Sequence, residues 1–169
     1  MVAVISRRAA LLSGVALVLT ACTRAPRFLE YRGPEVTEVR VYKGARRLEL
    51  WHHDQLLEDY EIGLGQNPIG HKEYEGDSRT PEGSYIIDRR NPQSAYHLSI
   101  GISYPNEEDT ARAAAAGVPP GGDIFIHGRG EWGPERRGDW SAGCITVTNS
   151  EIEDIYAMVR DGTPIHLYP

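Results

Sequence analysis

A histidine and a cysteine in the C-terminal half of the chain have the residue types of a base and a nucleophile. His127 ends the apolar run of residues 123–127, and Cys144 opens a second apolar run seventeen residues later. A thiolate is a strong nucleophile, and a neighbouring imidazole lowers the pKa of a thiol or accepts its proton. If the two runs form neighbouring strands, the sequence predicts that His127 and Cys144 face each other as a nucleophilic pair.

Three small residues beside this pair fit the same chemistry. Gly128 directly follows His127, and a backbone carbonyl at this point can anchor the second nitrogen of the imidazole. Gly143 lacks a Cβ atom, so the backbone can turn until its own amide and that of Cys144 point at the oxygen of an attacked carbonyl. Ser141 lies in the same segment and is a further candidate for binding the oxyanion or the substrate.

Other roles for Cys144 are weaker. A free cysteine is often an inert buried residue, but the adjacent glycine and the upstream histidine favour a nucleophile. Metal binding would need further ligands, and the spacing of His52, His53, His71 and His97 matches no zinc pattern, so we expect no metal. Disulfide exchange would need a second cysteine in the mature domain. We expect no organic cofactor either, because a covalent intermediate already divides the barrier into two steps.

The composition limits the size and the partners of the domain that must hold these residues. The chain has 169 residues, of which 40% are apolar, as expected for one globular domain. Its 18 Lys plus Arg against 24 Asp plus Glu give a net charge of -6, which argues against a nucleic-acid-binding protein. Two cysteines are too few for a disulfide scaffold.

The N-terminus has the pattern of an export signal. Residues 1–22 contain a pair of arginines, an apolar stretch shorter than the roughly 18–20 residues that span a bilayer, and small residues before Cys22. Residues 19–22, Leu-Thr-Ala-Cys, resemble a bacterial lipobox, in which the cysteine becomes the acylated first residue of the mature protein. Plain secretion and an uncleaved membrane helix are the alternatives. We therefore expect a signal peptide over residues 1–22, lipidation at Cys22, a tether over residues 23–34, and a periplasmic, membrane-anchored domain over residues 35–169.

The elements that must position the pair are mostly short strands. Apolar runs bounded by Gly and Pro predict strands at residues 36–42, 48–52, 60–64, 84–87, 97–103 and 124–127. Two segments predict helices instead. One covers residues 107–116 after the cap Asn106, and the other follows Thr148, where Glu151 completes a capping box. We expect a mainly β domain with a few short helices, one of them near the C-terminus.

The segment Ser141-Ala142-Gly143-Cys144, with His127-Gly128 upstream, resembles the signature of the L,D-transpeptidase catalytic domain, also called the YkuD domain. The resemblance extends to residues 77–83, Asp-Ser-Arg-Thr-Pro-Glu-Gly, and to residues 96–101, and it covers nearly all of residues 35–169. It implies a β-sandwich-like catalytic fold and periplasmic work on peptidoglycan stem peptides. It also implies that Cys144 is the nucleophile, that His127 is the general base, and that the carbonyl of Gly128 orients the base.

Two departures from the family pattern leave the reaction open. Many members carry His where Ala142 stands and Arg or Asn near the position of Thr146. The segment after Cys144 is similar to the YafK-type branch, which includes members that hydrolyse rather than join. The resemblance therefore implies an extracytoplasmic cysteine acyltransferase that carries out L,D-transpeptidation through a thioester. The alternatives are a YafK-like thiol hydrolase of peptidoglycan, acting as an L,D-endopeptidase or amidase, and a catalytically silent wall-binding lipoprotein.

The loop of residues 128–140 supplies candidates for substrate binding. Its arginines either hold the carboxylates of a peptide stem or are solvated surface charges; they are Arg129, Arg136 and Arg137. Trp132 and Trp140 are expected to pin the loop by packing. The expected partners are thus peptidoglycan stem peptides and, through the lipid anchor, a membrane, but not nucleic acid. The sequence makes no prediction of oligomeric state.

Overall fold

The computed structural model describes residues 28–169, without the side chains of residues 133–135. The expected signal peptide, its Cys22 and residues 23–27 of the expected tether lie outside the described residues. In the remainder of that tether, Tyr31 packs against the core of the domain. A search of the described helices finds none that is long and apolar enough to cross a membrane.

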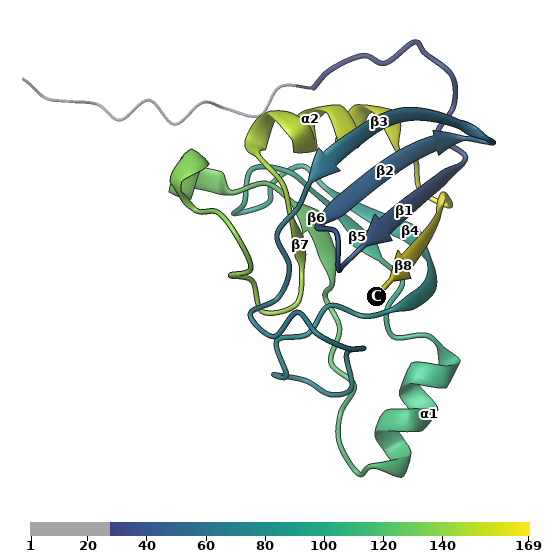
Figure 1. Ribbon diagram of the computed structural model, residues 1–169, viewed down its shortest axis with the longest axis vertical. Coiled ribbons are helices and arrows are strands. Elements are labelled where there is room, and N and C mark those ends of the chain that lie inside the picture. The colour runs from purple at the N-terminus through teal and green to yellow at the C-terminus, as the bar shows by residue number, and fades with distance from the viewer. Residues whose placement is uncertain (1–27) are drawn as a thin grey trace, which may run out of the picture.

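Within residues 28–169, eight strands form one curled, mixed sheet in the order β3-β2-β1-β8-β4-β5-β6-β7 (Figure 1). β4 joins the two halves of the sheet, because it pairs with β8 at its start and with β5 towards its end. β1 with β8 and β6 with β7 are the parallel pairs. The strands are β1 (Glu38–Tyr42), β2 (Arg47–His52), β3 (Gln55–Glu61), β4 (Gly83–Asn91), β5 (Ser99–Ile102), β6 (Phe125–His127), β7 (Ile145–Thr146) and β8 (Pro164–Tyr168).

Both helices begin at the caps that the sequence predicts. α1 (Glu107–Ala115) starts after Asn106, whose side chain accepts the N–H of Asp109 at 2.9 Å. α2 (Asn149–Met158) starts after Thr148, and Glu151 completes its capping box. The two helices lie at opposite ends of the molecule (Figure 1), and α2 contacts β5 and β6. The prediction of a mainly β domain with short helices, one near the C-terminus, is confirmed.

The core lies between α2 and the sheet and continues under the strands of the first half. Alternate residues of β1 and β8 are buried, as a half-buried strand requires. In β6 and β7, Ile126 and Ile145 are fully buried, and Ile152 and Ile155 of α2 complete this part of the core. The strand pair that carries the expected active residues is therefore held from behind by apolar packing.

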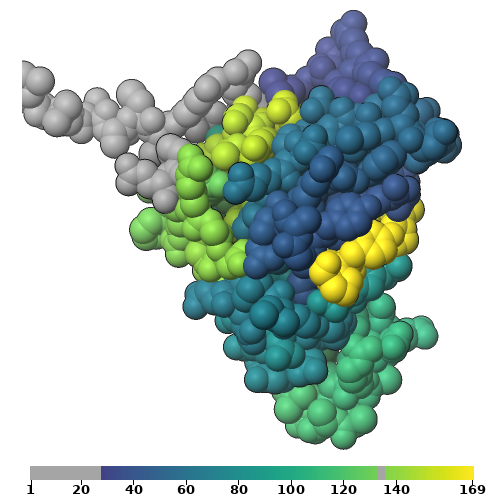
Figure 2. All heavy atoms as spheres, in the orientation of Figure 1, coloured from purple at the N-terminus to yellow at the C-terminus, as the bar shows by residue number. Residues whose placement is uncertain are grey.

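The sequence pattern does not predict β8, which lies near the middle of the sheet between β1 and β4. The strand is short and begins with Pro164, a residue that cannot donate to the ladder and that marks strand starts. Its Ile165 and Leu167 are nevertheless buried against the core. Figure 2 shows this last strand as a yellow strip at the surface beside the N-terminal strands.

None of the predicted strands has the exact bounds of the structure, and two of the differences change where particular residues lie. Only residues 60 and 61 of the predicted strand 60–64 belong to β3, and the following chain leaves the hairpin, so that Gly63 and Gly65 form single bridges with Thr146 and Ser141. The prediction that His97 lies in a strand is wrong, because β5 begins two residues later and His97 has a φ of 83°. Its ring turns inward to Glu153.

Candidate active site

The register of the sheet puts His127 and Cys144 on the same face. β6 and β7 are parallel neighbours, with Ile126 opposite Ile145 and His127 opposite Thr146. Paired residues in a ladder point to the same face, and so do residues two apart along an extended chain. Cys144, two residues before Thr146, therefore shares a face with His127, while Ile126 and Ile145 fill the opposite, buried face.

The imidazole of His127 is anchored by its neighbour. Its Nδ1 lies 2.6 Å from the carbonyl oxygen of Gly128, and because a carbonyl only accepts, Nδ1 carries the proton. Nε2 is then the free acceptor of the ring. His127 is only 4% exposed. Burial lowers the pKa of His127, although the bond to Gly128 acts in the opposite direction. The ring is therefore neutral at pH 7 and ready to accept a proton.

Only glycine fits at position 128. A Cβ atom on Gly128 would lie 2.7 Å from Oδ1 of Asn149 and 2.8 Å from the carbonyl oxygen of Tyr96. Contacts under 3 Å would force the backbone to move, and with it the carbonyl that holds His127. The predicted role of Gly128 in orienting His127 thus agrees with a hydrogen bond and with a steric requirement for glycine.

Asn149 is a site residue that the sequence reasoning does not identify. Its Oδ1 accepts the backbone N–H of Arg129 at 2.8 Å and of Gly130 at 3.0 Å, and its Nδ2 donates to the carbonyl of Gly130 at 2.9 Å. The side chain at the start of α2 therefore fixes the chain immediately after His127. The sequence does contain a signal for this residue, because an asparagine stands at the first helical position shortly after the cysteine motif.

The thiol of Cys144 is half-buried, and its Sγ lies 3.5 Å from the carbonyl oxygen of Asp123. Burial raises the pKa of Cys144, and the charge of Asp123 acts in the same direction. The backbone N–H of Phe125 and the charges of Lys72 and Arg89 oppose this rise. Together the two shifts favour a protonated Cys144 thiol and a neutral His127 imidazole at neutral pH.

The loop before the thiol is folded around Ser141. The Gly143 N–H donates to the Ser141 hydroxyl at 3.1 Å, and this hydroxyl donates to the Cys144 carbonyl at 2.7 Å. Gly143 has a φ of 135°, a region that favours glycine, and a Cβ atom there would lie 2.7 Å from the carbonyl oxygen of Arg79. The expectation that the Gly143 amide points at an attacked carbonyl is therefore not met in this structure. The amide of Cys144 itself remains as a donor.

The Asp-Ser-Arg-Thr-Pro-Glu-Gly element of residues 77–83 supports this loop from the side. Asp77 is buried, and its carboxylate binds Nζ of Lys72 at 2.8 Å and accepts the N–H of Arg79 at 3.0 Å. Burial raises the pKa of Asp77, but these and further backbone hydrogen bonds outweigh it and hold the pKa below its ordinary value. This fixed turn presents the Arg79 carbonyl to Gly143 and brings the positive charge of Lys72 near the thiol.

Aromatic rings enclose the other side of His127. The ring of Tyr96 stacks on the imidazole with 4.4 Å between centroids, and the ring of Trp140 meets it edge-on at 5.7 Å. Trp132 lies in a short 3-10 helix, Gly130–Glu135, and is 63% exposed. The guanidinium of Arg136 lies over both indole rings, 4.7 Å from Trp132 and 4.0 Å from Trp140. Trp140 thus lies next to the imidazole, and Arg136 lies over the Trp140 ring.

The structure does not bring all three loop arginines together. Arg129 and Arg137 line a separate cleft of about 220 Å³, together with Glu61 and Glu151. This cleft carries charges of both signs, whereas Arg136 lies over two indole rings. Of the three candidate arginines of the loop, Arg136 is the one that lies over Trp140, the ring beside His127.

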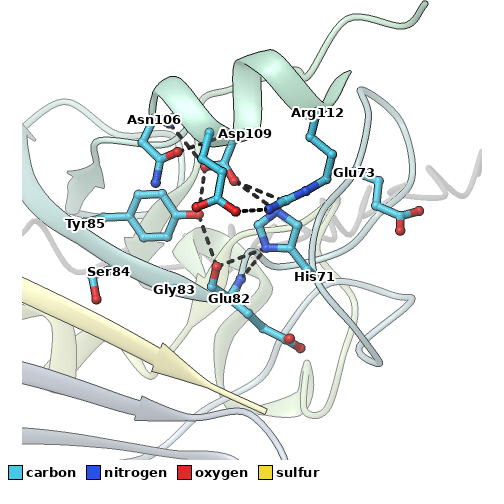
Figure 3. Close-up of a pocket in the computed structure, with 10 residues that line it drawn as sticks. His71, Glu73, Glu82, Gly83, Ser84, Tyr85, Asn106, Asp109 and Arg112 are labelled. Carbon is cyan, nitrogen blue, oxygen red and sulfur yellow. Dashed lines mark hydrogen bonds and ion pairs between the residues drawn. The ribbon is translucent and has the colours of Figure 1, made fainter. Parts of the chain in front are cut away.

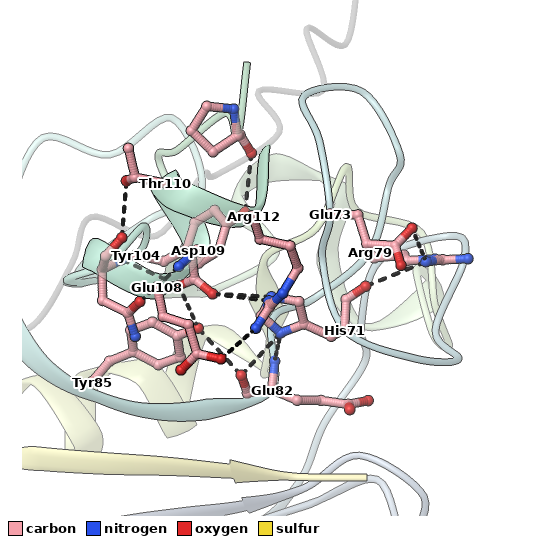
Figure 4. Close-up of polar contacts among 12 residues, drawn as sticks. His71, Glu73, Arg79, Glu82, Tyr85, Tyr104, Glu108, Asp109, Thr110 and Arg112 are labelled. Carbon is pink, nitrogen blue, oxygen red and sulfur yellow. Dashed lines mark hydrogen bonds and ion pairs between the residues drawn. The ribbon is translucent and has the colours of Figure 1, made fainter. Parts of the chain in front are cut away.

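A larger cleft of about 560 Å³ lies between α1 and the start of β4 (Figure 3). Its buried centre is Asp109, which accepts the hydroxyl of Tyr85 at 2.8 Å and lies 3.0 Å from Nε2 of His71. Arg112 binds both Asp109 and Glu108 (Figure 4). Because these groups neutralise one another, we interpret the cluster as the attachment of α1 to the sheet, and Cys144 does not line it.

His97 also has a structural partner. Its Nε2 lies 2.8 Å from Oε1 of Glu153 on α2, and both side chains are buried. This contact links α2 to the residue next to Tyr96, whose ring stacks on His127.

Comparisons with known proteins agree with this geometry. The family model described as YkuD, L,D-transpeptidase catalytic domain, matches residues 37–167. The YafK protein of Escherichia coli (strain K12) is 31% identical over 127 residues, which are 72% of this chain and 46% of YafK. The chain thus spans less than half the length of this relative.

Solved structures show the same fold. The helical cell shape determining protein Pgp2 of Campylobacter jejuni matches with a TM-score of 0.62 and 25% identity over 85% of this chain and 51% of Pgp2. An L,D-transpeptidase of Xylanimonas cellulosilytica (residues 123–326) matches with a TM-score of 0.54 and 14% identity over 82% of this chain and 63% of that structure. From the family match over residues 37–167, the chain belongs to the YkuD family of L,D-transpeptidase catalytic domains.

Proposed function

We propose that this protein is an extracytoplasmic cysteine acyltransferase that acts on peptidoglycan stem peptides through a thioester on Cys144. The observation that carries the proposal is the placement of His127, whose Nδ1 is bound to the Gly128 carbonyl while Cys144 shares its sheet face. A neutral imidazole with a free Nε2 is what a protonated thiol needs as its base. No metal or organic cofactor takes part in the proposed reaction.

In the first step, Nε2 of His127 accepts the thiol proton while Sγ of Cys144 attacks the carbonyl of the L-centre of the diamino acid at stem position three. A C–S bond forms, and the negative charge on the oxygen is stabilised by the Cys144 amide. The C–N bond then breaks as His127 returns the proton to the departing D-amino acid. The products of this step are a thioester and a free amine.

In the second step, an acceptor releases the acyl group from Cys144. An amine of a second stem attacks the thioester, gives its proton to His127 and forms the new amide, and the thiol is restored. This outcome is L,D-transpeptidation. Membership of the YkuD family of L,D-transpeptidase catalytic domains supports it.

Hydrolysis is the second candidate, and a specific feature of the site favours it. Ala142, two residues before the thiol, is exposed and presents only a methyl group where many relatives carry an imidazole. Trp132 of the neighbouring loop is 63% exposed. A thioester in such a site is open to water, as a YafK-like hydrolase would require.

The proposed location outside the cytoplasm rests on the N-terminal pattern of residues 1–22. A precursor with Cys22→Ser should lose its lipid and move from the membrane fraction to the soluble periplasmic fraction, with its catalytic activity retained. Unchanged membrane association of the Cys22→Ser precursor would contradict lipidation at this residue.

Intact-mass measurement after mixing the purified protein with muropeptides tests the proposed reaction. We expect a thioester adduct on the wild type, loss of the terminal D-residue, and cross-linked product when an amine acceptor is added. Cys144→Ala should bind the muropeptide without an adduct or turnover. Binding by the wild type without any adduct or product would contradict the proposal and favour a catalytically silent wall-binding protein.

A carbapenem provides an independent probe of the acyl pocket. Because the site offers a thiol and an amide to an acyl carbonyl, the drug should add its mass to the wild type and not to Cys144→Ala. An unchanged mass, with the thiol still open to a small alkylating reagent, would count against an acyl pocket at Cys144.

A further inference from the structure

The guanidinium of Arg136 is held between two indole rings. Its central carbon lies 4.0 Å from the ring centre of Trp140 and 4.7 Å from that of Trp132. A planar guanidinium that stacks on aromatic rings uses its faces and keeps the N–H groups at its edge available. The two rings therefore orient a cation without consuming its hydrogen bonds.

Arg136 also differs in its partners from most arginines within residues 28–169. Ion pairs to carboxylates engage Arg32, Arg40, Arg46, Arg47, Arg79, Arg89, Arg112 and Arg160. Among the side chains that the structure describes, no carboxylate pairs with Arg136, although the whole chain has a net charge of -6. An oriented cation without an anion is a binding group for a carboxylate from outside the chain.

The position of the Arg136 guanidinium indicates which part of the substrate it can bind. Trp140, on which Arg136 lies, meets the His127 ring at 5.7 Å. In the proposed reaction His127 delivers its proton to the departing amine, so the leaving residue lies on the His127 side. The α-carboxylate of an amino acid is only one carbon away from its amine.

We propose that Arg136 is a specificity-determining residue that binds the free α-carboxylate of the residue leaving from the donor stem. The inference rests on the proposed acyl transfer at Cys144 and adds the donor requirement to it. Donors whose leaving residue ends in a free carboxylate are accepted, and donors in which the same carboxyl group is an amide lose this contact.

The test compares two synthetic donor stems that differ only at the leaving D-residue, which ends in a carboxylate or in a carboxamide. For the wild type we expect kcat/KM to be about 10-fold to 100-fold higher for the carboxylate donor, the range of a charge-assisted hydrogen bond. Arg136→Gln should lose this preference by turning over the carboxylate donor more slowly, while its rate on the carboxamide donor changes less than about 2-fold. Arg136→Lys should keep part of the preference, because lysine keeps the positive charge but lacks the paired N–H donors of a guanidinium.

Arg137→Gln is the matched control, since it removes the neighbouring cation, which lines the separate cleft. It should keep the full donor preference. Alkylation of Cys144 by iodoacetamide, a neutral reagent, should proceed at the wild-type rate in Arg136→Gln if the site is intact.

The outcomes separate this inference from the proposed function. Turnover of both donors by the wild type at equal kcat/KM, or an equal loss on both donors in Arg136→Gln, would overturn the role of Arg136 and leave the acyl transfer standing. No turnover of either donor by the wild type, with Cys144 still alkylated, would overturn the acyl transfer and the inference with it.

Discussion

The Gly143 N–H donates a hydrogen bond to the Ser141 hydroxyl at 3.1 Å, so this amide is engaged within the loop that precedes the thiol. The same hydroxyl donates to the Cys144 carbonyl at 2.7 Å. One side chain therefore sets the backbone on both sides of the Gly143–Cys144 peptide bond, and it determines where the Cys144 amide points. We therefore infer that Ser141 acts by positioning this peptide bond.

Ser141→Ala should therefore lower both activity and stability. Loss of the two hydrogen bonds should reduce the free energy of unfolding by about 1–3 kcal/mol. Because the Cys144 amide and Sγ lose their fixed orientation, kcat should fall by about 10-fold to 100-fold. Denaturant unfolding and steady-state kinetics with muropeptides measure the two effects. Ser141→Thr keeps the hydroxyl and is the control; a wild-type kcat in Ser141→Ala would contradict the positioning role.

The opposite pKa shifts of the pair predict two separated pH dependences. Burial raises the pKa of Cys144 and lowers that of His127. Alkylation by iodoacetamide follows the thiolate, so its rate should keep rising above about pH 8.5, the ordinary thiol pKa. Turnover needs a neutral imidazole, so its acid limb should lie below about pH 6.5. A plateau of alkylation between these two values would indicate a preformed thiolate–imidazolium pair instead.

The lowered pKa of His127 also has a consequence for stability. The unfolded chain takes up a proton as the pH falls through about 6.5, and the folded protein does so only at lower pH. The contribution to folding is thus fully present above the unfolded pKa and is lost as the pH falls towards the folded pKa. The melting temperature should decline over this window in the wild type, and less steeply in His127→Gln; identical slopes would contradict the shift.

Asn149→Ala should disturb the base without touching the substrate. It removes three hydrogen bonds that fix the chain after His127, to the N–H groups of Arg129 and Gly130 and to the Gly130 carbonyl. We expect kcat to fall by about 10-fold to 100-fold while KM changes little, because the general base loses its orientation and not its contact area. Asn149→Asp keeps the two acceptor bonds and should be less damaging. A change confined to KM would argue for a direct substrate contact.

Features of the fold that depend on neighbouring residues can be predicted from the sequence, and features that depend on residues far away in the chain cannot. The caps of both helices and the strand end at His127 depend on neighbouring residues, so the sequence predicts them. β8 gains its place from pairing with β1 and β4, which are far away in the chain, and its five residues carry a weak pattern. The place of Asn149 after the cysteine motif makes it a candidate, but its contacts with Arg129 and Gly130, 20 and 19 positions earlier, depend on the fold.

The site shows the same division. The prediction that His127 and Cys144 act as a pair comes from a motif, whereas the engagement of the Gly143 amide depends on the rotamer of Ser141. The three loop arginines look equivalent in the sequence. Only the folded loop separates Arg136, on its indole rings, from Arg129 in the neighbouring cleft.

The last prediction distinguishes joining from hydrolysis with the two tryptophans of the loop. Trp140 lies against His127 at 5.7 Å, so its indole is the apolar group best placed to limit water at the thioester, whereas Trp132 is 63% exposed. In a transpeptidase, Trp140→Ala should therefore raise the ratio of hydrolysed to cross-linked product several-fold at a fixed amine concentration, because water gains access. Trp132→Ala is the control, because it also removes an indole that contacts Arg136. It should leave the ratio of hydrolysed to cross-linked product close to that of the wild type. Chromatography of the products with increasing acceptor measures the ratio. Wild-type protein that yields only hydrolysed stems at every acceptor concentration would contradict transpeptidation and leave the thiol hydrolase as the function of this site.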